Sequence, residues 1–412
     1  MNVWIVNHYA IPPSMGGLVR HYYFSKYLQQ KGHKVKIFTS SKIHNTDINM
    51  IEDHSLYKEV MVDGVEYTFV NSKDYNGNGL DRIINLIDFP FKTWKAMKCF
   101  LNKKKPDVIY ASTPDIFIAF FAILFAKKNK IPVVTEIRDL WPESIVDYNG
   151  MSKKNLIIQI LYKIEKWIYT KSNQLIFTMK GGKEYIKDKG WDTVIDLKKV
   201  HNVNNGVDLD EFERNANFYQ IDDEDLQSEK LFKVVYVGSV RKVNNLSTLI
   251  KASEYLKDKD EIVILIYGDG TEREQLEQKC IKEGLRVKFK GRIEKRYIPY
   301  ILKKSNLNLI NVKEAGINKY GCSWNKLFEY MASERPILCN LPVEYDLIKE
   351  YNLGITRKFA DSKEYADIIL HFYNLGEKQY QQYCENAKEC AKQFDYKKLC
   401  DKVERILIKA CN

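Results

Sequence analysis

Short apolar segments alternate with helical stretches along most of this chain, and this alternation constrains the fold more than any other feature. In the first half, segments 3–9, 33–40, 106–112 and 131–137 have strand character. Strands that alternate with helices are covered on both faces, so these segments predict a parallel sheet between layers of helices.

A second alternating set follows a polar, acidic and turn-rich stretch. Its expected strands are 231–238, 261–270, 286–291, 307–312 and 335–340. A chain of 412 residues exceeds what one hydrophobic core usually supports, so two domains are expected. We expect a first domain at 1–203, a linker at 204–230, a second domain at 231–395 and a carboxy-terminal helix at 396–412. Two α/β halves imply a cleft between them, the usual place for a ligand.

The composition is that of a globular protein with a basic surface. Hydrophobic residues make up 45% and charged residues 29%, and the formal net charge is +11. This balance favours anionic partners such as phosphorylated small molecules or anionic lipid, although many lysines only keep a surface soluble. Nucleic-acid binding is not expected, because the lysines are dispersed and no nucleic-acid module is recognisable.

The chain has features of a cytoplasmic protein. Its eight cysteines form no CxxC pair, which indicates free thiols in a reducing compartment. The amino terminus lacks the basic start and long apolar run of a signal peptide. The longest apolar run, 116–126, is shorter than the roughly 20 residues needed to span a bilayer, and is expected to be a buried helix.

The segment SWNKLFEYMASERPIL, 323–338, predicts a helix whose first turn faces an anion. Ser323 is expected to cap the helix, with Asn325 and Lys326 in its first turn. Unpaired N–H groups and the helix dipole favour an anion there, and Lys326 adds a charge. Glu329 lies among the apolar residues of this helix. It needs partners, which two ribose hydroxyls could supply, or else it reaches solvent.

Three further loops follow expected strands. In YVGSVRKVNN, Gly238 ends a strand, and Arg241 and Lys242 could hold a pyrophosphate or form a solvated basic turn. Two glycine pairs could allow close backbone approach to a ligand or serve as structural turns. These pairs are Gly268 with Gly270, and Gly16 with Gly17.

A dense group of charges follows the strand at 131–137. In TEIRDLWPES it comprises Glu136, Arg138, Asp139 and Glu143. Such a group at a strand end indicates a cleft wall, and the alternative is a structural ion pair involving Arg138 and Asp139 or a neighbour.

In this order, the motifs resemble those of the family-four glycosyltransferases of the GT-B fold, particularly bacterial enzymes that make O-antigen, capsule and other surface glycans. The Gly-Gly loop, RDLWPES, NNGVD, YVGSVRKVNN, YGDG, FKGRIEK and NKLFEYMASERPIL carry this resemblance over nearly the whole chain. It implies two Rossmann-like domains facing each other across a cleft, with the carboxy-terminal helix packing back on the first domain.

The resemblance also implies a retaining transfer of a sugar from a UDP-linked donor, with N-acetylated and deoxy sugars as candidates. Arg241 and Lys242 would neutralise the departing diphosphate, and Glu329 would bind the ribose hydroxyls. Arg138 and Asp139 are the other catalytic candidates. The remaining donor-binding candidates are Gly16, Gly17, Gly238, Ser239, Gly268, Gly270, Ser323, Asn325, Lys326 and Leu327.

Several positions depart from the family pattern. Relatives commonly carry a glutamate eight residues before Glu329, where this chain has Gly321, and a histidine where it has Ser112. Arg138 replaces the histidine of a His-Asp pair. No cofactor or metal is expected. The DxD patterns at 208–210, 223–225 and 258–260 are interpreted as solvated turns.

The segment 82–106 combines aromatic and basic residues. Phe91, Trp94, Met97 and Leu101 recur at helical spacing beside lysines, which suits an anionic membrane surface or an ordinary packed helix. The expected partners are therefore a nucleotide sugar, a glycan or polyprenyl-linked acceptor and the inner face of the cytoplasmic membrane. A nucleotide-sugar epimerase and a non-catalytic glycan-assembly subunit remain as alternative functions.

Overall fold

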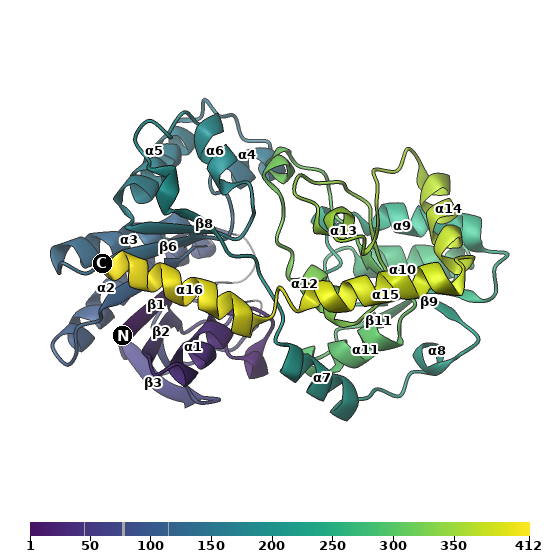
Figure 1. The fold of residues 1–412 in the computed structure, drawn as a ribbon, viewed down its shortest axis with the longest axis horizontal. Coiled ribbons are helices and arrows are strands. Elements are labelled where there is room, and N and C mark those ends of the chain that lie inside the picture. Colours follow the sequence, from purple (N-terminus) through teal and green to yellow (C-terminus); the bar gives the residue numbers. More distant parts are fainter. Residues whose placement is uncertain (45, 76–78, 114) are drawn as a thin grey trace. The chain divides into compact units, whose positions relative to one another are not determined.

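The computed structural model describes residues 1–44, 46–75, 79–113 and 115–412, and these residues form two compact units. Unit 1 comprises Met1–Asn204 together with Tyr396–Asn412, and unit 2 comprises Asn205–Asp395. Figure 1 shows that each unit has a sheet with helices packed around it.

Unit 1 is built on a sheet with strand order β3-β4-β2-β1-β5-β6-β7-β8. All neighbouring strands are parallel except β3 and β4. The strands are β1 (Asn2–Asn7), β2 (Lys34–Ser40), β3 (Tyr57–Val62), β4 (Val65–Val70), β5 (Val108–Ser112), β6 (Val133–Ile137), β7 (Gln174–Phe177) and β8 (Val200–Asn202). The helices are α1 (Arg20–Gln30), α2 (Leu80–Leu101), α3 (Ile116–Lys128), α4 (Glu143–Asn149), α5 (Leu156–Lys171), α6 (Gly182–Asp188) and α16 (Tyr396–Cys411).

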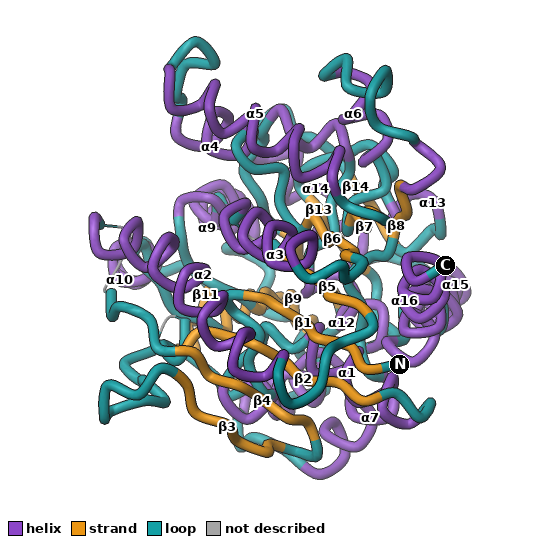
Figure 2. Tube along the Cα trace, turned by 90° about the vertical axis from the view of Figure 1, so that its left-hand side faces the viewer, coloured by secondary structure: helices purple, strands orange, loops and turns teal. Residues whose placement is uncertain are grey.

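Alternation along β1 shows how the helices cover both faces of this sheet. Val3 and Ile5 belong to the core that contains α1 and α16. The intervening Trp4 contacts the rings of Phe100 in α2 and Phe125 in α3. Successive strand residues point to opposite faces, so one strand serves two cores. Figure 2 shows α2 and α3 side by side. Packing of α16 into unit 1 confirms the prediction for the carboxy-terminal helix.

Unit 2 contains a fully parallel sheet with strand order β11-β10-β9-β12-β13-β14. Its strands are β9 (Phe232–Val237), β10 (Ile262–Tyr267), β11 (Val287–Gly291), β12 (Leu307–Ile310), β13 (Ile337–Cys339) and β14 (Gly354–Thr356). Its helices are α7 (Leu209–Phe218), α8 (Glu224–Gln227), α9 (Leu246–Ser253), α10 (Arg273–Lys282), α11 (Ile298–Lys304), α12 (Asn325–Ala332), α13 (Leu347–Glu350), α14 (Ser362–Tyr373) and α15 (Glu377–Ala391).

The segment 204–230, expected to be a linker, contains α7 and α8. Phe212 and Leu226 from these helices lie in the core beside β9 and β10. Asp208 and Asp223 cap the two helices with their side chains. The acidic residues that gave the segment a linker-like composition therefore include helix caps, and the apolar residues between them are buried.

No helix of the described residues is both long enough and apolar enough to cross a membrane. The apolar run 116–126 lies in α3, most of whose side chains are buried or half-buried. It is therefore a core helix of unit 1, as the sequence predicted.

Candidate functional site

Two glycine-containing loops pack against each other where β9 and β10 end. Gly238 directly follows β9, and its N–H donates to the Tyr267 carbonyl at 3.0 Å. A Cβ at Gly268 would lie 1.7 Å from the Gly238 carbonyl oxygen, and one at Gly270 would lie 2.3 Å from the Val240 carbonyl oxygen. Only glycine allows the loops to approach this closely.

The first turn of α12 brings a lysine to the same strand end. The Lys326 Nζ donates to the Tyr236 hydroxyl at 3.1 Å and lies 4.3 Å from the centre of that ring. A Cβ at Gly238 would lie 2.8 Å from this Nζ. Burial lowers the pKa of Lys326 to about 8. The carboxyl end of β9 thus carries a cation where parallel sheets commonly bind ligands.

Packing on the sheet fixes the position of α12. The Tyr330 hydroxyl accepts from the N–H of Val237 at 3.1 Å. Met331 and Leu327 lie in the core of unit 2. The Leu327 N–H already donates to the Trp324 carbonyl, and the Leu327 side chain is in the core. In this structure, this donor-binding candidate therefore contributes packing.

Ser323 does not cap α12, and this prediction was wrong. Trp324 occupies the cap position without a side-chain hydrogen bond, and exposed Asn325 begins the helix. The Ser323 hydroxyl accepts from the Asn205 N–H at 2.8 Å, and the Ser323 carbonyl accepts from the Asn205 amide at 2.5 Å. Asn205 thus supplies a competing donor that the local sequence did not reveal.

Glu329 lies one turn after Lys326 and forms an ion pair with Lys295. Its side chain is 16% exposed, so the carboxylate remains accessible. Lys295 was not predicted as a site residue. It lies in FKGRIEK, but only the fold brings that loop to α12.

Arg241 and Lys242 lie on the exposed part of the loop after β9. The structure gives neither side chain an ion pair or hydrogen bond within its described ranges. The loop itself is held by the Asn244 amide, which donates to the carbonyl and hydroxyl of exposed Ser239 at 2.6 and 2.8 Å. An ordered loop therefore presents both cations to solvent, where they are available to an anion.

In unit 1, the glycine loop follows β1 and precedes α1. Gly16 has a φ of +154°, and a Cβ there would lie 2.7 Å from the Ile11 Cδ1 atom. Gly17 is exposed, and a Cβ there would meet no atom within 4 Å. Packing explains Gly16, whereas Gly17 has no packing requirement.

Glu136 is buried within unit 1. The sequence analysis grouped it with the other charges of TEIRDLWPES and did not predict its burial. It accepts from the Arg20 Nε at 2.8 Å, the Tyr110 hydroxyl at 2.5 Å and the Ser112 hydroxyl at 2.7 Å, and lies 3.3 Å from the His21 Nε2. Burial alone raises the pKa of Glu136, but Arg20 and His21 hold it well below its usual range. The group orders the carboxyl ends of β5 and β6.

The other charges of this motif separate. Asp139 is exposed and Arg138 is half-exposed after β6. Glu143 forms ion pairs with Lys153 and Lys189. Burial opposes ionisation of Glu143, but hydrogen bonds from these partners lower its pKa to about 2. Glu143 therefore has a structural role, whereas Arg138 and Asp139 remain accessible at the strand end.

The DxD patterns were interpreted as solvated turns, which was wrong for two of them. Asp208 is buried as a helix cap, and Asp223 and Asp225 form ion pairs with Lys290. Asp260 is exposed, as expected, and its Oδ1 lies 3.3 Å from the Arg286 Nη1. The described residues contain no group of three or more His, Cys, Asp or Glu side chains that could hold a metal ion.

Helix α2 exposes an apolar stripe that shares only Phe91 with the predicted one. Met97 is only 1% exposed, and Trp94 packs against Phe125 of α3. The exposed apolar residues occur earlier in the helix, at helical spacing: Leu80, Ile83, Ile84, Ile87 and Phe91. Of the expected stripe, Trp94 and Met97 face the core because α3 covers that side, whereas Phe91 is exposed.

Two known families match the sequence in succession. The pattern of Glycosyltransferase Family 4 matches residues 15–211. The pattern of Glycosyl transferases group 1 matches residues 219–390, which include the glycine loops and α12. The chain is a glycosyltransferase built from these two domains. A search of curated proteins finds no match.

Solved structures of GT-B glycosyltransferases share the fold of this glycosyltransferase. Sucrose-phosphate synthase from Thermosynechococcus elongatus has 15% identity and a TM-score of 0.74, with 98% of each chain covered. Trehalose-phosphate synthase (UDP-forming) from Burkholderia vietnamiensis has 14% identity and a TM-score of 0.76, covering 100% of this chain and 97% of that one. HepE of Anabaena in complex with UDP has 14% identity and a TM-score of 0.68, covering 99% and 100%. The predicted α/β GT-B fold is confirmed.

Proposed function

We propose that this glycosyltransferase is a retaining enzyme that uses a UDP-linked sugar and acts in cell-surface polysaccharide synthesis, such as that of lipopolysaccharide or capsule. The acceptor is a glycan or a polyprenyl-linked glycan. The bond between the sugar's anomeric carbon and the terminal phosphate oxygen breaks, and that carbon forms a bond to an acceptor oxygen. The acceptor hydroxyl releases its proton, and UDP leaves.

The position of Lys326 is the observation that carries the donor assignment. Its ammonium lies beside Gly238 at the end of β9, and Arg241 and Lys242 are exposed three and four residues further on. Negative charge develops on the diphosphate as the sugar departs, and fixed cations lower that barrier. UDP as the leaving group is supported by HepE, which binds UDP and UDP-glucose, and by the UDP-forming trehalose-phosphate synthase.

Glu329 is proposed to bind the ribose hydroxyls. Its carboxylate already has one donor, Lys295, and its accessible surface can accept two hydroxyl hydrogen bonds. Lys295 then acts by positioning the carboxylate. Each side chain on this face of α12 thereby has a distinct role: Lys326 for charge and Glu329 for the nucleoside.

The exposed stripe of α2 supports an anionic membrane surface as a further partner. Helix α5 adds Leu156, Ile157 and Ile160, which are 74, 62 and 48% exposed. Helix α2 leads into β5 and α5 leads into β7, so each helix ends near the amino end of a strand. Each helix therefore begins near the opposite, carboxyl edge of the sheet, and its exposed apolar residues start there. Exposed Lys95 and Lys98 follow the α2 stripe and suit anionic headgroups. We therefore propose that the enzyme acts at the inner face of the cytoplasmic membrane.

A calorimetric screen of UDP-sugars tests the donor assignment. Wild-type protein should bind UDP, and Glu329→Ala should weaken uridine nucleotides more than inorganic pyrophosphate, because only the former carry a ribose. Lys282→Ala, an exposed lysine on α10, is the matched folded control. Unchanged UDP affinity in Glu329→Ala contradicts the ribose role. Conversion of a donor without any acceptor would instead support an epimerase.

Vesicle flotation tests the membrane assignment separately. The variant Ile83→Ser/Ile87→Ser should lose binding to vesicles containing phosphatidylglycerol. Ile281→Ser is the control, because Ile281 is 69% exposed but lies on α10 of unit 2. Equal flotation of all three proteins, or no flotation of wild type at low salt, contradicts the assignment.

A further inference from the structure

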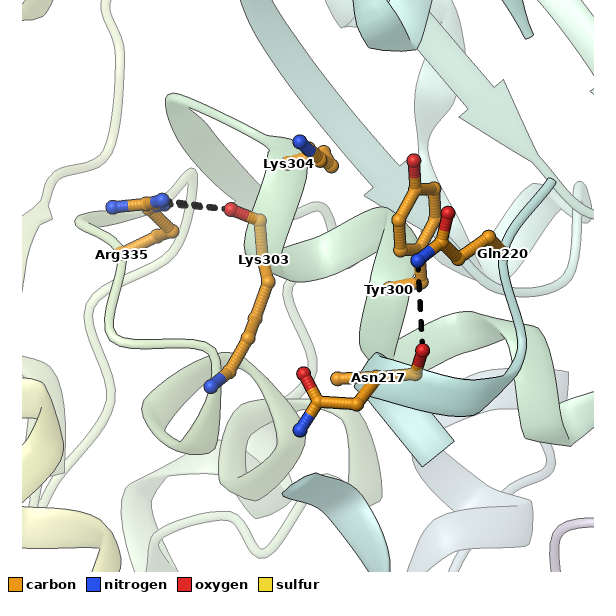
Figure 3. Close-up of a pocket in the computed structure, with 7 residues that line it drawn as sticks. Asn217, Gln220, Tyr300, Lys303, Lys304 and Arg335 are labelled. Carbon is orange, nitrogen blue, oxygen red and sulfur yellow. Dashed lines mark hydrogen bonds between the residues drawn. The ribbon is translucent and has the colours of Figure 1, made fainter. Parts of the chain in front are cut away.

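Unit 2 has a concave site formed by residues of α7 and α11, by Gln220 after α7 and by Arg335, which precedes β13. The cavity has a volume of about 340 Å³ and is open to solvent. Figure 3 shows its lining. The residues are Ala216, Asn217, Gln220, Tyr300, Lys303, Lys304 and Arg335. The volume is that of a small-molecule site.

Positive charge exceeds negative charge around this cavity. Lys303 forms an ion pair with Glu213. The Arg335 Nε and Nη2 donate to the Lys303 carbonyl at 3.1 and 2.7 Å, an interaction drawn in Figure 3. Exposed Lys304 has no ion pair with any described residue. The Lys303 carbonyl neutralises no charge, and within the described part of the chain neither Arg335 nor Lys304 forms an ion pair with a carboxylate.

Lys233 is a fourth cation close enough to Lys304 and Arg335 to feel their charge. It is buried, and its Nζ donates to the carbonyls of Leu226 at 3.4 Å and Ser228 at 2.9 Å. Burial lowers the pKa of Lys233, the nearby charges of Lys304 and Arg335 lower it further, and Glu229 opposes the shift. Mutual repulsion of this kind is relieved when an anion binds.

This cavity is separate from the proposed donor site. Lys233 lies near the start of β9 and Gly238 follows its end. Five residues of extended strand span about 16 Å. The two sites therefore occupy opposite edges of the same sheet, and one ligand of UDP size cannot have its diphosphate in both.

We propose that the cavity binds a small phosphorylated sugar. Lys304 and Arg335 contact the phosphoryl group, because both carry charge that the protein leaves uncompensated. The amides of Asn217 and Gln220 and the Tyr300 hydroxyl contact the sugar hydroxyls. This assignment rests on unit 2 alone and does not depend on the proposed reaction.

Calorimetry with glucose 6-phosphate, inorganic phosphate and glucose tests the proposal. Lys304→Gln should weaken both phosphate-containing probes at least tenfold, and glucose alone should not bind. Gln220→Ala should weaken glucose 6-phosphate more than inorganic phosphate. The control Lys282→Gln should match wild type.

Two further arms locate the binding and identify its source. Lys326→Ala should retain glucose 6-phosphate binding, and Lys304→Gln should retain UDP binding, so failure of one site is distinguishable from failure of the other. Equal affinity in wild type and Lys304→Gln overturns the proposal, as does the absence of binding in wild type. Lys304-dependent binding only to phosphatidylglycerol vesicles also overturns it, in favour of a lipid headgroup.

Discussion

Lys326 donates a hydrogen bond to the Tyr236 hydroxyl, which in turn donates to the Ser239 carbonyl at 2.9 Å. One phenol thus connects the first turn of α12 with the loop that carries Arg241 and Lys242. The lysine is held before any ligand arrives, so less side-chain freedom is lost on binding than for an exposed lysine.

Replacing this lysine should weaken nucleotide binding. A hydrogen bond to a charged group contributes about 1.5–3 kcal/mol, so Lys326→Ala should reduce UDP affinity about 10- to 100-fold. Isothermal titration calorimetry measures the change, with Lys282→Ala as the exposed control. A loss below threefold, with circular dichroism unchanged, contradicts the proposed role.

The pKa of Lys326 predicts a pH dependence of UDP affinity. Because burial lowers this pKa to about 8, the free protein loses the ammonium proton as the pH rises above that value. A diphosphate favours the charged lysine, so binding then requires proton uptake, and affinity should fall by up to tenfold per pH unit. Lys326→Arg stays charged and should remove this slope between pH 7 and 9.5. The same slope in both proteins would assign it to another group.

The contact between the two glycine loops predicts a stability effect. In Gly268→Ala, the new Cβ overlaps the Gly238 carbonyl oxygen, and the backbone has to move. We expect a loss of at least about 2 kcal/mol, measured by urea unfolding. Gly284→Ala is the control, since Gly284 also has positive φ but open space around it, and should lose only about 1–2 kcal/mol. Equal losses would mean that backbone conformation alone explains both.

The buried Arg20 should be far more important for stability than an exposed cation. In Arg20→Met, Glu136 loses a 2.8 Å partner inside unit 1, at an expected cost of about 3–5 kcal/mol. Lys31→Met removes exposed contacts with Asp401 and Glu404 on α16 and should change the unfolding midpoint little. Similar midpoints for the two variants would show that water or rearrangement compensates Glu136.

Glu165 predicts a pH dependence of stability. Burial raises its pKa to about 8, although hydrogen bonds from Tyr169 and Tyr185 oppose the shift. Between the unfolded value near 4.5 and the folded value, the native state binds the extra proton, so stability falls as pH rises. In Glu165→Gln, the free energy of unfolding should fall less steeply with pH than in wild type, by about 1.4 kcal/mol per pH unit. Urea midpoints from pH 5 to 9 measure it, and parallel curves for both proteins contradict it.

The sequence predicted the parts of the fold that have a periodic apolar signal. The buried strands β1, β2, β9 and β10 appear within a few residues of their expected positions. The hairpin of β3 and β4 was missed, because β3 is an edge strand with exposed residues and little apolar character. The very short strands β8 and β14 lack enough residues to show a period.

For the candidate site, the sequence located residues but not their partners. The cluster of Gly238, Gly268, Gly270 and Lys326 could be assembled, because strand ends of a parallel sheet meet at one edge. The Lys295 partner of Glu329 and the Asn205 partner of Ser323 could not, since tertiary contacts alone select them.

Helix α16 has a consequence for the order in which the protein is completed during synthesis. Tyr396, Leu399 and Val403 fill the core of unit 1, next to residues from β1 and α1. Unit 2 has all of its residues once the ribosome has passed Asp395. Unit 1 begins earlier but is complete only after α16, which is translated last. Nascent unit 1 therefore leaves apolar surface uncovered for most of translation, and premature termination anywhere before residue 396 leaves that surface permanently exposed.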